Sequence, residues 1–282
     1  MGHTLVRPLR FTLQASLKYE LNISSLTPDN LKGKSKKQIA AMKLKLGRST
    51  VTVASLFSIS GSDSQKIVFS NCENKLIRIG ENMTQGSIEI SGNAGDYLGQ
   101  NMKGGYIEVK GNCENFAGAG MTGGKIEVHG DTGDFLGAAT VGNITGMNEG
   151  TIIVHGNAGS RIGDRMRRGM IVVFGNSGEY CASNMLAGTI IILGKTGAYL
   201  GFNMKRGTLV LGKKPIHLMA TFRDCGLLKI EFLRLLFKQL ALSCEQFKVF
   251  SDFGPEALRF AGDTSTDGMG EILILKNARN RR

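Results

Sequence analysis

Residues 86–123 read GSIEISGNAGDYLGQNMKG-GYIEVKGNCENFAGAGMTG, two copies of a 19-residue unit, and further copies follow along the chain. Successive copies are 19 residues apart except at one step of 26 residues, which holds a seven-residue insertion within residues 138–146. A degenerate copy, residues 67–85, precedes the series. A fixed period of this kind predicts stacked coils that share one core. The units begin at Gly86, Gly105, Gly124, Gly150, Gly169, Gly188 and Gly207.

Each unit begins with a strict two-residue alternation. Positions 3 and 5 are β-branched or leucine, whereas positions 2, 4 and 6 are mixed or polar in the first half of the series, which predicts a short strand with positions 3 and 5 inward. Glycine at position 7, followed mostly by Asn or Asp, predicts a turn. Apolar residues at position 13 and methionine at position 17 complete the interior. Position 3 is occupied by Ile88, Ile107, Ile126, Ile152, Ile171, Ile190 and Leu209.

A single coil of this length cannot bury its own apolar face, so neighbouring coils must stack about 4.8 Å apart. The handedness of parallel crossovers favours right-handed winding. The sequence therefore predicts an all-β-dominated fold, a right-handed parallel β-helix, with mixed α/β caps over its two open ends.

The distribution of charge and the extent of the 19-residue repeat divide the chain into three parts. Residues 1–66 hold 11 Lys/Arg against 3 Asp/Glu, residues 67–212 hold 12 against 12, and residues 213–282 hold 12 against 8. The first part is expected to be a basic cap of helix and strands, with helix starts at Thr27-Pro28 and Ser35 and a strand over 50–58. The second is the β-helix, and the third is a cap with an amphipathic helix over 226–243. Further strands are expected over 247–253 and 271–275.

The composition narrows the classes of function. The five cysteines have no CxxC spacing, and there is neither an export signal nor an apolar run long enough to span a membrane. We therefore expect a cytoplasmic protein without a disulfide framework and without a membrane role. Six lysines lie within residues 32–45, but no aromatic residues alternate with them and no nucleic-acid-binding motif is present, so nucleic acid is not expected as a partner.

Two rows of side chains could in principle carry chemistry. Glu89, Glu108 and Glu127 form an outward ladder at position 4, and such carboxylate rows occur in polysaccharide-active β-helices, so a stand-alone enzyme is the remote alternative. His129 and His155 share position 6; with two ligands and no carboxylate in their column, they predict a surface ladder rather than a metal site. The sequence thus predicts no catalytic and no metal-binding residues.

Four arginines make a basic patch on the otherwise neutral coils. Arg161 interrupts an aromatic column at position 12, and the insertion lies in the preceding coil. The patch is either a solvated corner or a contact for an anionic ligand or partner. Its members are Arg161, Arg165, Arg167 and Arg168.

The repeat resembles two families. One is the C-terminal domain of the glutamate synthase large subunit, and the other is the C-type subunit of formylmethanofuran dehydrogenase with its bacterial counterpart in the formyltransferase/hydrolase complex. The flanks resemble the C-type subunit, in its bacterial form above all. The segments that carry this resemblance are LTPDNL at 26–31, TFRDCG at 221–226, FLRLL at 232–236, AGD at 261–263 and GMGEIL at 268–273.

The resemblance implies a complex that transfers a formyl group from formyl-tetrahydromethanopterin to methanofuran or methylofuran and hydrolyses it to formate. It implies two partners: an amidohydrolase-like subunit that holds the metals, and a formyltransferase subunit. The chain itself would be a non-catalytic scaffold that binds no cofactor, with the arginine patch and basic flanks as candidate contacts for the carrier's polyglutamate tail. The alternative within the family is the C-type subunit of formylmethanofuran dehydrogenase, in carbon dioxide reduction.

Overall fold

The repeat units contribute one strand each to a large, mostly parallel sheet. The structure is a computed structural model that describes residues 7–243, 248 and 253–277. In that part of the chain a 13-stranded sheet runs in the order β15-β16-β17-β14-β13-β12-β11-β10-β9-β8-β6-β1-β5. The strands of the repeat are β6 (Asp63–Cys72), β8 (Ser87–Gly92), β9 (Tyr106–Val109), β10 (Thr122–Val128), β11 (Glu149–Val154), β12 (Met170–Val173), β13 (Thr189–Ile192) and β14 (Arg206–Leu211).

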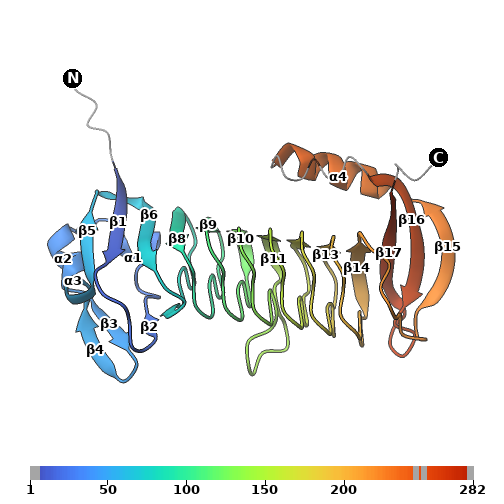
Figure 1. The fold of residues 1–282 in the computed structure, drawn as a ribbon, viewed down its shortest axis with the longest axis horizontal. Coiled ribbons are helices and arrows are strands. Elements are labelled where there is room, and N and C mark those ends of the chain that lie inside the picture. The colour runs from blue at the N-terminus through green and yellow to red at the C-terminus, as the bar shows by residue number, and fades with distance from the viewer. Residues whose placement is uncertain (1–6, 244–247, 249–252, 278–282) are drawn as a thin grey trace.

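The predicted register between units is confirmed. Ile107 pairs with Ile126, and Ile126 pairs with Ile152 across the 26-residue step, so the insertion leaves the pairing of position 3 intact. Figure 1 shows this insertion as a loop that projects from the row of coils. Its side chains Val141 and Ile144 are 90% and 81% exposed. The loop is therefore an addition to the surface of the stack rather than a break in it.

The far side of each coil is held by a second set of contacts. Isolated parallel bridges join position 9 of successive coils, from Ala94 through Cys113, Thr132 and Ala158 to Ser177. At position 8, each Asn or Asp side chain accepts a hydrogen bond from a backbone N–H of the next coil, as Asn93 does from Asn112. These side chains satisfy backbone donors that the short strands leave unpaired, which explains the Asn/Asp preference there.

The interior is a continuous apolar column. Positions 3, 5, 13 and 17 are almost completely buried along the stack. The methionines predicted to close the ring are each 0% exposed, which confirms that part of the interpretation; they are Met102, Met121, Met147, Met166, Met185 and Met204.

The N-terminal end of the column is covered by aromatic rings and a small second sheet. Phe11 of β1 (Pro8–Leu13) stacks on Phe69 at a centroid distance of 5.3 Å, and Phe57 of β5 (Phe57–Ser60) meets Phe11 edge-on at 6.0 Å. The second sheet, in the order β4-β3-β2-β7, lies beside them. Its strands are β2 (Leu21–Asn22), β3 (Lys43–Leu46), β4 (Ser49–Thr52) and β7 (Leu76–Ile77).

Both predicted helix starts in this region are confirmed, and the predicted strand is wrong at its centre. Thr27 caps α1 (Pro28–Leu31), and Ser35 with Gln38 forms a capping box on α2 (Lys36–Ala40). Residues 50–58, however, hold the end of β4, the short helix α3 (Val53–Leu56) and the start of β5. Burial of Val53 in the core requires the chain to turn there, which local β-propensity does not reveal.

At the other end, three strands and a helix extend the sheet and cover it. β17 (Met269–Asn277), which includes the predicted strand 271–275, pairs in parallel with β14, and β16 (Phe253–Gly262) and β15 (Arg223–Lys229) follow as antiparallel strands. Of the other predicted strand, residues 247 and 249–252 lie outside the described residues. None of the described helices is long and apolar enough to span a bilayer.

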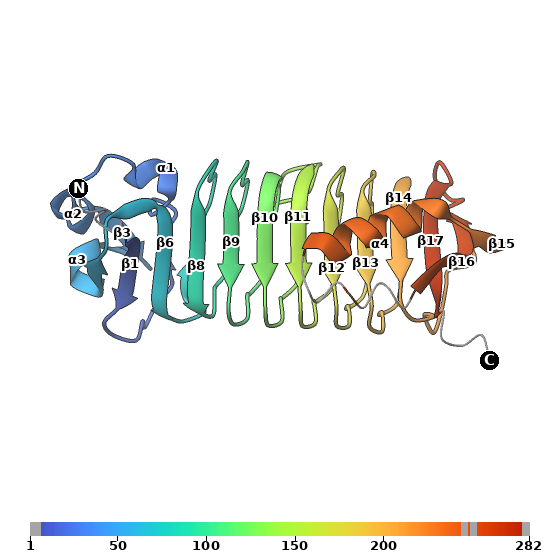
Figure 2. The ribbon, with the colours of Figure 1, turned by 90° about the horizontal axis from the view of Figure 1, so that it is seen from above.

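The predicted helix 226–243 begins later than expected. Helix α4 spans Glu231–Ser243, because Leu227 and Leu228 pair with Leu258 and Ala257 in the sheet instead. Figure 2 shows α4 lying across the outer face of the parallel strands. Its buried residues Leu233, Phe237 and Leu240 form one cluster with the outward position-4 row of the second half of the stack, Ile153, Val172, Ile191, Val210 and Leu273.

Candidate functional site: a basic groove and a Glu-His ladder

Arg161 fills a rung of the aromatic column. Its guanidinium lies 4.7 Å from the ring centroid of Tyr180 and 6.0 Å from that of Phe135. The rings on either side stack at similar spacings, for example 4.7 Å between Phe116 and Phe135. The arginine therefore continues the ladder through cation–π contacts rather than interrupting it.

Arg165 contacts the inserted loop. Its side chain donates a hydrogen bond to the carbonyl of Asn143 at 3.2 Å, and its own carbonyl accepts one from Gly146 at 2.9 Å. A neighbouring carboxylate, that of Asp164, lies 3.7 Å away. The expected proximity of the insertion to the patch is thus confirmed at this residue, which ties the loop to the coil that follows it.

Arg167 and Arg168 line a shallow groove of about 420 Å³ that includes neither Arg161 nor Arg165. They occupy positions 18 and 19, where the next coil has the smaller uncharged pair Leu186-Ala187 and the coil after that has Lys205-Arg206. Two dibasic rims thus face each other across one uncharged coil, with Asp267 as the acidic member of the lining. The sequence could have revealed Lys205 and Arg206, since they share the columns of Arg167 and Arg168.

The position-4 carboxylates are in register, and two of them, Glu108 and Glu127, are paired with lysine and histidine side chains. Glu108 binds Lys110 and His129, at 2.5 Å and 2.8 Å. Burial acts to raise its pKa, yet these hydrogen bonds outweigh burial and hold the pKa below the usual glutamate value. The more buried Glu127 accepts hydrogen bonds from His155, Lys125 and Tyr106, and its pKa is held far below normal, chiefly by the His155 contact.

These shifts argue against a glycosidase. Such enzymes need one carboxyl with a raised pKa as general acid. In Glu108 and Glu127 the environment favours the charged form instead. Glu108 and Glu127 are therefore suited to ion pairing or to ligation of a cation, and not to protonation of a leaving group.

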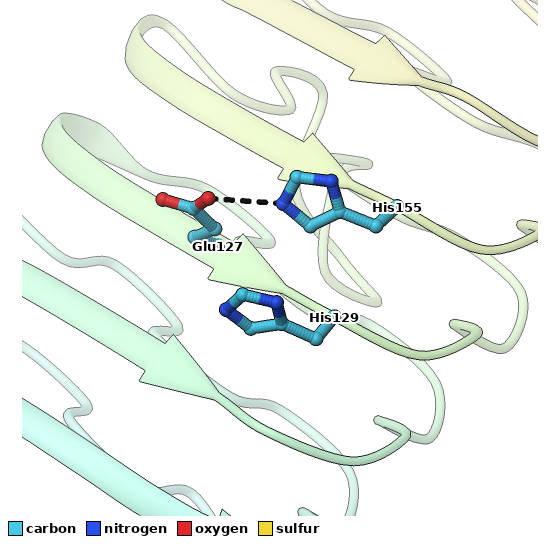
Figure 3. Close-up of side chains that lie close together, drawn as sticks. All are labelled: Glu127, His129 and His155. Carbon is cyan, nitrogen blue, oxygen red and sulfur yellow. Dashed lines mark hydrogen bonds and ion pairs between the residues drawn. The ribbon is translucent and has the colours of Figure 1, made fainter. Parts of the chain in front are cut away.

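The two histidines stack, and each reaches a carboxylate of the coil before its own, His129 that of Glu108 and His155 that of Glu127. Figure 3 shows the second of these contacts, with the ring of His129 beside it. The rings of His129 and His155 are 4.9 Å apart, and Phe174 continues the stack at 5.2 Å. The predicted ladder is thus present. The carboxylate partners were missed because they occupy position 4 rather than position 6. The alternation of the strand places both positions on the outward face, but it does not show that a side chain at position 6 reaches position 4 of the coil before.

Comparison with known proteins supports the resemblance. A family model described as "GXGXG motif" matches residues 61–222, more than half of the chain. The C-type subunit of the tungsten-containing formylmethanofuran dehydrogenase 2 of Methanococcus maripaludis strain S2 is 32% identical over 92 residues, which cover 32% of this chain and 34% of the relative. A second M. maripaludis protein of that name is 31% identical over 92 residues. The match spans about a third of the length of these relatives.

A solved structure matches over almost the whole chain. It is the crystal structure of the formyltransferase/hydrolase complex (FhcABCD) from Methylorubrum extorquens in complex with methylofuran. The matched chain is 33% identical, with a TM-score of 0.87, over 95% of this chain and 100% of that one. The chain described here therefore belongs to the GXGXG-motif family and, within it, to the family of C-type subunits of formylmethanofuran dehydrogenase.

Proposed function

We propose that this chain is a non-catalytic scaffold component of a formyltransferase/hydrolase complex. Such a complex would move a formyl group from formyl-tetrahydromethanopterin to a methanofuran-type carrier and release it as formate. The observation that carries the proposal is the match to a chain of the FhcABCD complex, which extends over both caps as well as the repeat. A complete match of that kind indicates the same task, whereas a match to the repeat alone would indicate only the architecture.

We infer that the stacked units form a right-handed parallel β-helix over residues 67–212, with the cap 1–66 at one end and the cap 213–282 at the other. The parallel pairing of eight repeat strands and the row of bridges on the far side support this architecture. A stiff rod with blocked ends suits a protein that holds others at fixed separations. A cytoplasmic location is part of the proposal, and the free thiols of Cys72, Cys113, Cys181 and Cys225 support it.

The partners would be an amidohydrolase-like subunit and a formyltransferase subunit. Apolar side chains that remain exposed on α4 and β15 are suited to such contacts, because a monomer gains nothing from leaving them in water. They include Leu227, Leu228, Phe232, Leu235 and Leu242, which are 39–82% exposed.

Co-expression with the two partner subunits from the same genome tests assembly. We expect the three chains to elute together in size-exclusion chromatography and to separate when Phe232 and Leu235 are both changed to Asp. Replacement of the exposed Lys36 and Lys37 by Asp on the opposite cap is the matched control and should leave the complex intact. Separate elution of the unmodified chains would contradict the proposal. Co-purification with a tungsten- or molybdenum-containing dehydrogenase instead would favour the alternative, the C-type subunit of formylmethanofuran dehydrogenase.

The basic groove favours a second role, which is contact with a polyanionic carrier tail. The groove offers Arg167, Arg168, Lys205 and Arg206 around one uncharged coil, a pattern that fits successive carboxylates of a polyglutamate chain. The R167E/R168E variant should abolish binding of a fluorescent oligoglutamate peptide. K36E/K37E makes the same change in charge on the basic N-terminal flank and should not, since the proposal assigns the tail to the groove and not to that flank. Binding to the unmodified protein should weaken as salt rises. Equal binding by both variants would exclude the groove.

A further inference from the structure

The only uneven step in the series of repeats lies between β10 and β11, and a cluster of metal-ligating side chains spans that step. Glu127 and His129 belong to the coil of β10, before the insertion, and His155 belongs to that of β11, after it. The three residues come from two paired strands of a rigid sheet and their ends, in which Glu127 lies opposite Ile153 and Val128 opposite Val154. Their backbone positions are therefore set by the sheet and not by the loop.

The ligand atoms already converge. One carboxylate oxygen of Glu127 and one ring nitrogen from each histidine all lie within 4.8 Å of one another. The Nε2 atom of His155 is 2.9 Å from Glu127, and that of His129 is 2.8 Å from Glu108, so both imidazoles point their Nε2 atoms at carboxylates. Figure 3 shows the two rings side by side with the carboxylate beside them.

Occupation by an ion requires only side-chain adjustment. Zinc holds imidazole nitrogens and carboxylate oxygens at about 2.0–2.2 Å, which places its ligands roughly 3.4 Å apart. The side chain of His129 is 33% exposed, so this ring has room to tilt toward the other two ligands. Lys125, whose ammonium lies 2.7 Å from the second oxygen of Glu127, is on the surface and can turn into solvent.

The ligand set selects the kind of ion. Two imidazoles and one carboxylate suit zinc and neighbouring divalent transition metals, whereas calcium and magnesium prefer oxygen ligands throughout. Three protein ligands leave one position of a tetrahedron open. His129 must give up its hydrogen bond with the carboxylate of Glu108 in order to turn its Nε2 atom toward the ion.

We propose that Glu127, His129 and His155 bind one divalent transition-metal ion of the zinc type, which fastens the coil before the insertion to the coil after it. The role is structural. The ion replaces the proton shared between Glu127 and His155, and it opposes separation of β10 from β11 where the connecting segment is longest. Because the histidines must be neutral to ligate, affinity falls as pH decreases. This site is independent of the proposed scaffold function, since it lies within one chain.

Titration of the tag-free, chelator-treated full chain with Zn²⁺ by calorimetry tests the proposal. We expect one saturable site per chain and a rise in Tm of roughly 5 °C at a hundredfold excess over Kd. H155Q and E127Q should each weaken binding on the order of a hundredfold, and H217Q, which changes an exposed histidine far along the chain, should not. Circular dichroism of each variant checks that it is folded.

A second measurement uses the unmodified chain, so that it does not depend on the variants. Co²⁺ should give the intense visible absorption of a tetrahedral site, and Zn²⁺ should remove that absorption. In imidazole ¹⁵N spectra, Zn²⁺ should shift the Nε2 signals of His129 and His155 but not the signals of His217. No saturable binding, histidine signals unmoved by Zn²⁺, or equal affinity in H155Q, E127Q and H217Q would overturn the proposal.

Discussion

Glycine at position 14 of the coils lies where the backbone closely approaches buried isoleucine side chains. Gly99, Gly118, Gly137 and Gly163 all have φ between +60° and +65°, and a Cβ on any of them would come within 2.4–2.6 Å of an isoleucine Cδ1 in a later coil. The same position in the next coil is Ala182, with φ +62°, and there the corresponding residue of the later coil is Leu209 instead of isoleucine. The change of partner accounts for the tolerance of a methyl group at this one rung.

Gly163→Ala should therefore destabilise the protein. The left-handed backbone and the contact 2.4 Å from Ile190 together predict a loss of about 1–2 kcal/mol in the free energy of unfolding, measured by denaturant titration. Ala182→Gly is the matched control and should remain within about 1 kcal/mol of the parent, because relief of strain offsets the lost methyl burial. An equal loss of unfolding free energy in both variants would show that the contact of position 14 with the isoleucine of a later coil does not explain the preference for glycine there.

The contacts of Glu127 predict that the stability of the fold depends on pH. Its pKa is lowered in the folded state by His155 of the β11 coil, Lys125 of β10 and Tyr106 of β9. A depressed carboxyl pKa stabilises the fold above the unfolded-state value, ordinarily 4.5, and this contribution is lost as pH falls from there toward the folded value. With a chelator present, E127Q should be less stable than the parent by about 1–3 kcal/mol at pH 7. Thermal unfolding across pH should show this gap closing below about pH 4.5; a gap that is constant down to about pH 3 would contradict it.

At the scale of elements, the position-4 row decides where helix α4 lies. The row is charged at Glu89, Glu108 and Glu127 and apolar from Ile153 onward. The sequence showed this change, and it predicted an amphipathic helix, but it could not show that the helix covers that half of the sheet. The sequence also could not give the first residue of the helix. Leu227 and Leu228 fit the helical pattern, but they pair with β16, and a pairing between segments so far apart in the chain cannot be read from local sequence.

Removal of a central contact should detach this helix. Phe237 is 4% exposed, and Phe237→Ala should weaken the docking of α4 by about 3 kcal/mol. Hydrogen exchange should then reveal faster exchange of the α4 amides, and a dye specific for apolar surfaces should bind the uncovered row. Leu235→Ala, at a residue 63% exposed, is the control and should change neither signal. Unaltered α4 protection in the Phe237 variant would show that the cluster does not hold the helix.

At the scale of the whole molecule, the stack was predictable and its lateral contacts were not. The period fixed which residues are neighbours in adjacent coils, down to Ile126 opposite Ile152 across the insertion. Contacts between different columns, such as His155 with Glu127, required the geometry of the sheet. The basic groove was predicted in part. Arg167 and Arg168 were recognised from the sequence as members of a basic patch, but Lys205 and Arg206, which form the other rim of the groove two coils away, were not.

The proposed scaffold role requires that the chain has no activity of its own and that its partners need it. The most direct test is formate release from a formylated furan carrier, measured with this chain alone, with the two partner subunits alone, and with all three. We predict no release by the chain alone and the highest rate from the three-chain assembly, with a lower rate when this chain is omitted. Turnover by the chain alone, or an equal rate without it, would contradict the account.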